Sequence, residues 1–182
     1  LLTNAVTGSS SGLVRLFQNA VAGSGGLAFG GTGGQGGTAS TSLLGSNPGG
    51  GPLESNISAI GGGGGGTSGI GLAGNGGDAT ANLEITSSNT ASAVAQANAG
   101  TGGNQFTSGI PGLAGLGTAT ARTTTTGGFR VQALSNSNGR TTSGMSRADT
   151  SGGPITSMSL RANQLNFKGI YPNLYDAHPP FQ

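Results

Sequence analysis

The chain has 182 residues, and only 7% of them are charged, against about 25% in ordinary soluble domains. The formal net charge of +2 comes from seven scattered basic residues, which excludes a basic nucleic-acid-binding surface, and the absence of cysteine excludes disulfides and thiolate metal sites. No stretch approaches the roughly 18 consecutive apolar residues of a transmembrane helix. We interpret Leu1 as the start of a processed chain, because neither an initiator Met nor a signal-peptide pattern is present.

The composition predicts a thin hydrophobic core. Apolar residues make up 32% of the chain, many of them Ala, while 40 residues are Gly. Glycine loses the most backbone entropy on folding and contributes no side chain to pack. We therefore expect a single copy to be marginally stable and neighbouring copies to supply part of the buried surface.

An internal repeat with a spacing of 40 residues organises the sequence. The segments GTASTSL, GDATANL and GTATART begin at Gly37, Gly77 and Gly117. A second alternating pattern ends in glycine at Gly26, Gly63 and Gly103. Each repeat is therefore predicted to hold a glycine-rich arm, a strand A, a short turn and a strand B.

The predicted elements begin with residues 12–22, where an alternating strand competes with a helix whose apolar stripe would be Leu13, Leu16, Phe17 and Ala20. We favour the strand, because its end matches those of the later B strands. Strand A is predicted at 38–43, 78–86, 118–126 and a diverged copy at 155–163; strand B is predicted at 53–60, 90–99 and 129–135.

Period-two alternation predicts which faces are buried. It places Ala91, Ala93, Ala95, Ala97 and Ala99 on one face of a strand. Ala39, Ala79 and Ala119 are expected to lie in register and to form part of the interior. For the glycine-rich arms, above all Gly61 to Gly66, solvated loops compete with polyproline-II-like strands, and we favour loops.

These elements predict an all-β repeat protein of about 40 residues per repeat, with stacked β-hairpins forming a β-solenoid or a β-sandwich and an extended C-terminal tail. The repeat domain spans 1–169, and the Pro- and aromatic-rich tail spans 170–182. Within the domain we expect a partial repeat at 1–26, repeats at about 27–66, 67–106 and 107–146, and a diverged repeat at 147–169.

Catalytic and cofactor-binding constellations are not visible. One His, three Asp, two Glu and one Lys are scattered, and His178 lies in the Pro-rich tail, so we predict neither an enzyme nor a bound cofactor or metal. The segment GNGGDAT at Gly74 to Thr80 partly matches a calcium-binding nonapeptide, but it occurs once. No phosphate-binding GxxxxGK[ST] motif exists, and the sequon at Asn56 is a short pattern expected by chance.

Hydroxyl side chains suggest one further alternative. Thr38, Ser40, Thr80, Thr118 and Thr120 occupy similar places on strand A, so stacked repeats would align them in a ladder. Such arrays resemble those of β-solenoid antifreeze proteins. Asp78 interrupts this ladder, which makes ice binding the least favoured function.

The tail is the candidate subunit interface. It combines aromatic residues with three prolines that favour an extended backbone. We expect it to dock onto a neighbouring subunit rather than cap its own last repeat, through Ile170, Tyr171, Leu174, Tyr175 and Phe181.

The glycine-rich blocks GGTGGQGG, at Gly30 to Gly37, and GNGGDAT resemble those of exported bacterial surface proteins, including the mycobacterial PE_PGRS group and exosortase-sorted matrix proteins. The resemblance implies a secreted or cell-surface location. Together with the composition, it leads us to expect a self-assembling subunit of an extracellular filament, sheath or matrix whose partners are copies of itself. The alternative is an adhesin or fibre-tip segment that binds a surface glycan or receptor.

Overall fold

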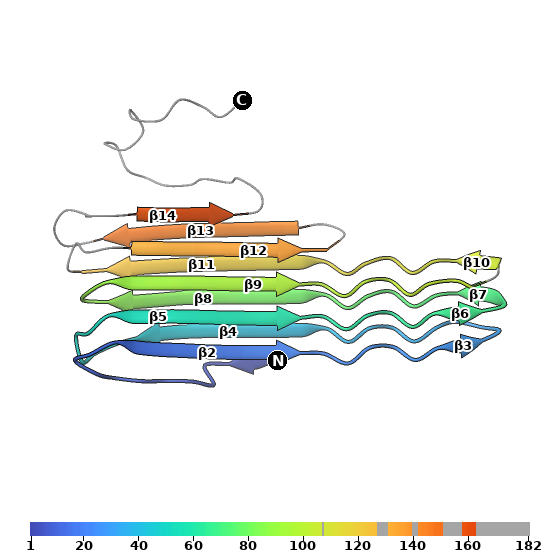
Figure 1. The fold of residues 1–182 in the computed structure, drawn as a ribbon, viewed down its shortest axis with the longest axis horizontal. Helices are drawn as coiled ribbons and strands as arrows, with labels where there is room; N and C mark the ends of the chain where they lie inside the picture. The colour runs from blue at the N-terminus through green and yellow to red at the C-terminus, as the bar shows by residue number, and fades with distance from the viewer. Residues whose placement is uncertain (107, 127–130, 140–141, 151–157, 163–182) are drawn as a thin grey trace, which may run out of the picture.

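The computed structural model describes residues 1–106, 108–126, 131–139, 142–150 and 158–162. In this part of the chain the fold is an all-β parallel β-solenoid of about three turns, with about 39 residues per turn and no helix. Two stacked ladders of strands form its body, and long glycine-rich arms project from one side of that body (Figure 1). The expected repeat fold is confirmed, and of the two predicted arrangements it is the solenoid.

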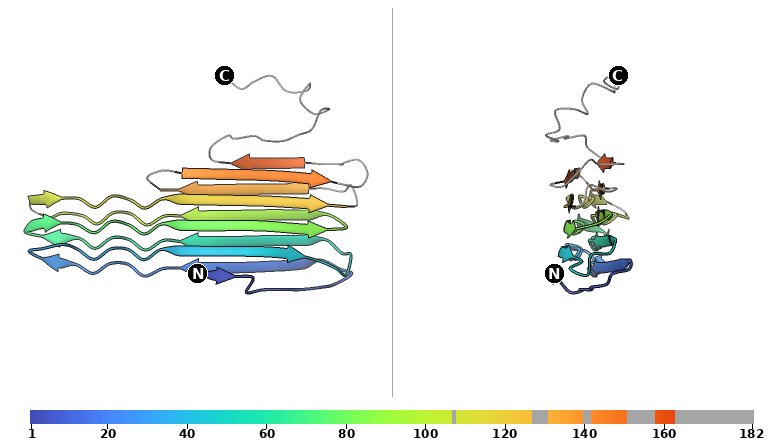
Figure 2. Two further views of the ribbon diagram at one scale, coloured as in Figure 1. Left: turned by 180° about the vertical axis from the view of Figure 1, so that it is seen from behind. Right: turned by 90° about the vertical axis from the view of Figure 1, so that its left-hand side faces the viewer.

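The body consists of two five-stranded parallel sheets, in which each strand pairs with its counterpart one turn later. Consecutive strands such as β4 and β5 therefore lie in opposite sheets (Figure 2). Sheet A runs in the order β1 (Leu2–Thr3), β4 (Ala39–Ser46), β8 (Ala79–Ser87), β11 (Gly117–Thr125) and β13 (Thr142–Thr150). Sheet B runs in the order β14 (Met158–Ala162), β12 (Val131–Asn138), β9 (Ala91–Asn98), β5 (Leu53–Ile60) and β2 (Val14–Val21).

Strand β2 confirms the choice of strand over helix at the N-terminal end of the domain. Its side chains alternate strictly between buried and exposed. Leu16 and Ala20 point into the core, whereas Phe17 is exposed on the outer face of sheet B. The helical stripe, which would have put Leu16 and Phe17 on one face, does not form.

The core between the sheets is lined by aliphatic residues whose size falls toward the arms. Leu43, Leu83, Ile57 and Ile85 are fully buried in the middle of the strands. Near the arms the inward positions are held by Ala20, Ala59, Ala97, Ala39 and Ala79. The predicted Ala face of β9 is confirmed, because Ala91, Ala93, Ala95 and Ala97 are buried and Ala99, just beyond the strand, packs partly buried against the core. Small side chains let the two sheets converge toward the arms, where backbone meets backbone.

The N-terminal segment closes the bottom of the core around Gln18. This buried side chain donates from Nε2 to Thr41 Oγ1 at 2.7 Å and to the Ser42 carbonyl at 3.1 Å, and its Oε1 accepts the Ala5 N–H at 2.8 Å. Each polar atom of the amide is therefore satisfied where the hydrophobic stack ends. Gln18 ties β2, β4 and the N-terminal segment together.

The register of strand A departs from a constant 40-residue spacing. Ala39 pairs with Ala79, as predicted, but Ala79 pairs with Gly117, so that Ala119 lies beside Ala81. A shift of two residues preserves the face of every side chain. All three predicted alanines are accordingly buried, although Ala119 belongs to the next row of the stack.

Replacing Ala79 by Leu should destabilise the solenoid by about 1–3 kcal/mol, because three extra heavy atoms enter a filled layer. Ala79 is 1% exposed and lies directly between Ala39 and Gly117. Urea denaturation of the variant and the parent measures this difference. An unchanged midpoint would mean that the inner face of sheet A is open to water.

The last turn contradicts the predicted position of its strand A. The segment predicted at 155–163 contains β14, which belongs to sheet B, while sheet A is continued by β13. Gly117 pairs with Thr142, only 25 residues later, because this turn passes directly from β12 to β13 without an arm. Extrapolating the 40-residue period therefore assigned the wrong strand.

Candidate functional site: the glycine arms

In the described ranges, the arms are six extended segments that carry the chain from sheet B to a distant tip and back to sheet A (Figure 1). We call residues 22–27, 61–66 and 99–104 the outgoing arms, and residues 32–38, 73–78 and 111–116 the returning arms. Short strands pair in parallel at the tips: β3 (Ala28–Phe29) with β6 (Thr67–Ser68), and β7 (Ile70–Leu72) with β10 (Ser108–Ile110).

Backbone hydrogen bonds between arms recur at every third residue. Within the outgoing layer, Ala22, Gly25 and Ala28 donate to Ile60, Gly63 and Gly66 of the arm above. Between the layers, Gly37 donates to Gly23, Gly62 to Gly37, Gly77 to Gly62, Gly100 to Gly77, and Gly115 to Gly100, at 2.8–2.9 Å. A period of three in extended chain is the geometry of polyproline II. The preference for solvated loops is therefore wrong: the arms are a two-layer slab of polyproline-II-like chains.

In an arm that is covered on both sides, such as residues 61–66, glycine is required at two of every three positions because neighbouring backbones touch there. A Cβ added at Gly64 would overlap the carbonyl oxygen of Gly74 in the other layer. One added at Gly65 would overlap the carbonyl oxygen of Gly26 in the arm below. A Cβ at Gly63, the third position, would make only ordinary contacts, with two hydroxyl oxygens at 3.7 Å and the Thr101 carbonyl oxygen at 3.8 Å. The third position of a triplet, as at Gly63, therefore faces outward and has room for a side chain, whereas a Cβ at Gly66, next to the tip, would lie 2.9 Å from the Asn104 carbonyl oxygen.

Outward side chains on the returning arms bind the backbone of the next turn. Gln35 Oε1 accepts the Asn75 N–H at 2.9 Å, and Asn75 Oδ1 accepts the Leu113 N–H at 2.9 Å. Asp78 Oδ1 accepts the Leu116 N–H at 2.7 Å. The Asp of the GNGGDAT segment thus has a structural partner. No group of three potential metal-ligating residues occurs in the described ranges.

The spacing of non-glycine residues was the signal that sequence analysis missed. In GGTGGQGG and the following Thr38, the side chains of Thr32, Gln35 and Thr38 fall three residues apart. All three are exposed. A glycine-glycine-X pattern with a period of three predicts polyproline-II-like packing, just as a period of two predicts a strand.

Large apolar side chains gather on the outer arm surfaces and the tips. Phe29 is 82% exposed and Ile70 is 86% exposed. Others that are exposed in the same region are Leu27, Leu72, Phe106, Ile110, Leu113 and Leu116. Apolar groups exposed close together mark an interaction surface more often than an idle one.

On the body strands from β2 to β11, whose side chains the structure describes, the outer faces carry sparse charge and no single hydroxyl ladder. Arg15 Nε lies 2.8 Å from Glu54 Oε2 on sheet B, and Arg122 Nη1 lies 3.2 Å from Glu84 Oε1 on sheet A. Both pairs are solvent-accessible and contribute little stability. Ser40, Thr80 and Thr118 form one row, but Thr120 aligns with Ser42 and Asn82, and Thr38 precedes the strand. The predicted ladder is therefore divided among several rows.

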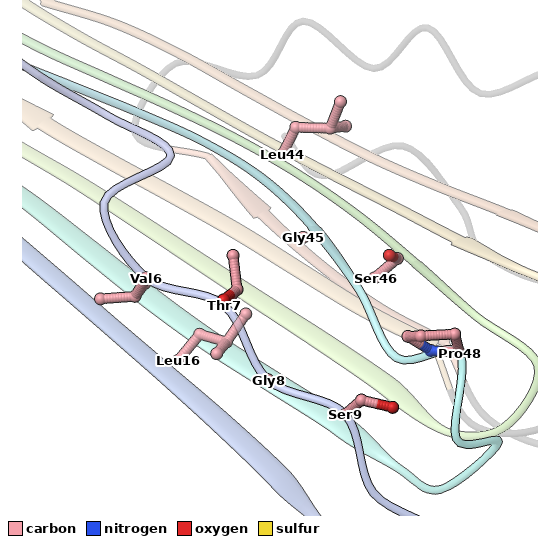
Figure 3. Close-up of a pocket in the computed structure, with 9 residues that line it drawn as sticks. All are labelled: Val6, Thr7, Gly8, Ser9, Leu16, Leu44, Gly45, Ser46 and Pro48. Carbon is pink, nitrogen blue, oxygen red and sulfur yellow. The ribbon is translucent and has the colours of Figure 1, made fainter.

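A shallow hollow of about 370 Å³ lies between the N-terminal segment and the end of β4 (Figure 3). It has no titratable side chain in its lining, which comprises Val6, Thr7, Gly8, Ser9, Leu16, Leu44, Gly45, Ser46 and Pro48. This lining can contact an apolar group, and its Ser and Thr hydroxyls have no titratable acid or base beside them in the lining.

The predicted interface residues of the tail lie outside the described residues: Ile170, Tyr171, Leu174, Tyr175 and Phe181. Within the described part of the chain, there is no helix of the length and hydrophobicity that a membrane span needs. Comparison of the chain with protein-family models, with curated proteins and with solved structures finds no match.

Proposed function

We propose that this protein is a structural, self-assembling subunit of an extracellular filament, sheath or matrix. The observation that carries the proposal is the concentration of exposed apolar side chains on the arms and tips, headed by Phe29 and Ile70. In a chain with 7% charged residues, few charges oppose contact between such surfaces. Contact with further copies would bury these groups, which the thin body and long arms of a single copy leave exposed.

Concentration-dependent assembly of the parent chain tests this function. We expect size-exclusion chromatography to show species larger than a monomer as concentration rises, and negative-stain microscopy to show regular polymers. A compact monomer at every accessible concentration would refute the proposal.

Removal of residues 170–182 should weaken assembly, because three large aromatic side chains of the tail each bury about 150–250 Å² when they dock. Thermal melting of the truncated monomer should stay unchanged. Light scattering and calorimetry separate these quantities. A truncated chain that polymerises like the parent but melts earlier would make the tail an intramolecular cap.

A second candidate function is adhesion through the tips. Phe29 and Phe106 are both exposed on the glycine-rich arms and tips, and aromatic faces of this kind stack on sugars. A glycan array that shows selective, saturable binding, lost in a Phe29→Ala/Phe106→Ala double variant, would favour the adhesin over the assembly subunit.

A further inference from the structure

We propose that copies of this chain stack through the edges of their arm slabs, with each copy turned by a half-turn about the stacking axis, so that bodies alternate on opposite sides of a central ladder of arms. This inference rests on the proposed self-assembly and specifies its contact. The first outgoing arm, residues 22–27, forms the bottom edge of the slab, and the last returning arm, residues 111–116, forms the top edge.

The two edges carry complementary unpaired backbone groups. In each layer an arm donates N–H groups to carbonyls of the arm above, as Gly25 does to Gly63 and Gly76 does to Leu113. At the top edge the equivalent Ala114 N–H has no acceptor among the described residues. At the bottom edge the equivalent carbonyls of Ser24 and Leu27 have no donor there. The Ala114 N–H of the top edge thus matches the acceptor carbonyls of the bottom edge, which recur at every third residue.

The bottom edge is also shaped to receive another chain. A Cβ added at Gly23 or Gly26 would meet no atom within 4 Å, so the monomer does not need glycine at either position. The equivalent Gly62 and Gly65, one turn up, would overlap the backbone of the arm below. An arm of another copy lying beneath positions 23 and 26 would explain why both are glycine.

The shape of the body selects the half-turn. Strands β12, β13 and β14 rise above the last arm on the body side, so a second copy stacked by simple translation would collide with them (Figure 1). A half-turn places the second body beyond the tips of the first. It also exchanges the two layers, so that the second copy's arm 22–27 lies on arm 111–116 of the first and runs in the same direction.

The number of layers agrees with this arrangement. In the described residues each copy has three turns with arms and five strands in each sheet of the body. Two copies on the same side are therefore separated by six turns, which is more than the five strands of a sheet. The bodies therefore fit without overlap at a spacing of about 4.8 Å per turn. The half-turn also brings the exposed Phe29 and Ile70 at the tips against the neighbouring body.

Two variants that block opposite edges test the proposal. Gly23→Ala/Gly26→Ala places methyl groups on the bottom edge, where they have open space in the monomer. Ala114→Pro removes the N–H of the top edge; the same arm already holds Pro111 one triplet earlier, so the ring suits its backbone. We expect each variant to raise the concentration needed for assembly at least tenfold.

Mixing gives the decisive result. Each variant keeps one intact edge, so an equimolar mixture should form 1:1 dimers and no polymer in analytical ultracentrifugation, and each should stop growth of the parent at substoichiometric amounts. Ser24→Ala, on the outward face, is the matched control and should assemble like the parent. Circular dichroism and amide exchange verify that both edge variants keep the folded arms.

If the parent assembles and both edge variants assemble equally well, the stacking mode is refuted while the proposed function stands. If the parent stays monomeric, the proposed function itself fails. Electron micrographs of the polymer should show bodies alternating on two sides of a central ladder; bodies on one side only would refute the half-turn.

Discussion

Gly65→Ala should unfold the arms while leaving the solenoid body folded. The added Cβ would overlap the Gly26 carbonyl oxygen and lie 2.6 Å from its carbonyl carbon, and both are backbone atoms that cannot rotate away. Relief requires separation of the arms, which breaks the bonds that Gly65 makes with Gly34 and Gly74. Overpacking and two lost hydrogen bonds together cost about 3 kcal/mol or more.

Amide hydrogen exchange resolved by peptide measures this effect. Protection should fall across residues 61–78 and persist in β9 (Ala91–Asn98), whose bonds lie in the body. Gly63→Ala is the control, because its Cβ meets nothing closer than 3.7 Å; it should be neutral or stabilise the arm by up to about 1 kcal/mol. Equal exchange in the two variants would contradict the three-residue period.

The strands were predictable because their signal is local. Alternation in Ala91 to Ala97 and in β2 depends only on neighbouring residues facing opposite sides. The local pattern could not distinguish a solenoid from a sandwich, because the same alternation occurs in parallel and in antiparallel sheets. Only the register of Ala79 with both Ala39 and Gly117 distinguishes them, and that is a contact between turns.

The arms were harder to predict, because glycine leaves no hydropathy pattern. Gly61 to Gly66 contains no side chain, so neither alternation nor amphipathicity can be measured there. Its order comes from contacts with Gly37 and Gly34 on one side and with residues one turn away on the other. A run of six glycines in isolation would be a flexible coil. The sequence signal for the arms lies instead in the neighbouring arms, where non-glycine residues such as Gln35 and Asn75 recur at every third position of their own arm.

The missing arm of the last turn could not be anticipated from the period. Val131 pairs with Ala91 at the full spacing, yet Thr142 follows Gly117 by only 25 residues. Strand pairing in a solenoid depends on which side chains face the core and not on the length of the connecting segment. A turn can therefore lack an arm and still add a strand to each sheet. The same omission leaves the top edge of the slab uncovered, and this edge is the surface on which we expect a second copy to stack.

Leu83→Ala should lower the free energy of unfolding by about 2–5 kcal/mol, the usual range for a buried leucine truncated in a packed core. Leu83 is fully buried in β8 and lies in register between Leu43 of one turn and Ala121 of the next. Because the alanine next to it cannot fill the cavity, the cost should lie in the upper half of that range.

Leu44→Ala is the control on the opposite face of the same sheet, where truncation of the exposed side chain should change the free energy of unfolding by no more than about 0.5 kcal/mol. Urea unfolding followed by circular dichroism compares the two variants. Since each turn of a solenoid contacts only its neighbours, a cavity in the middle turn weakens both interfaces at once, so the transition of Leu83→Ala should also broaden. Equal losses for the two variants would mean that the inward face of sheet A has been assigned to the wrong side.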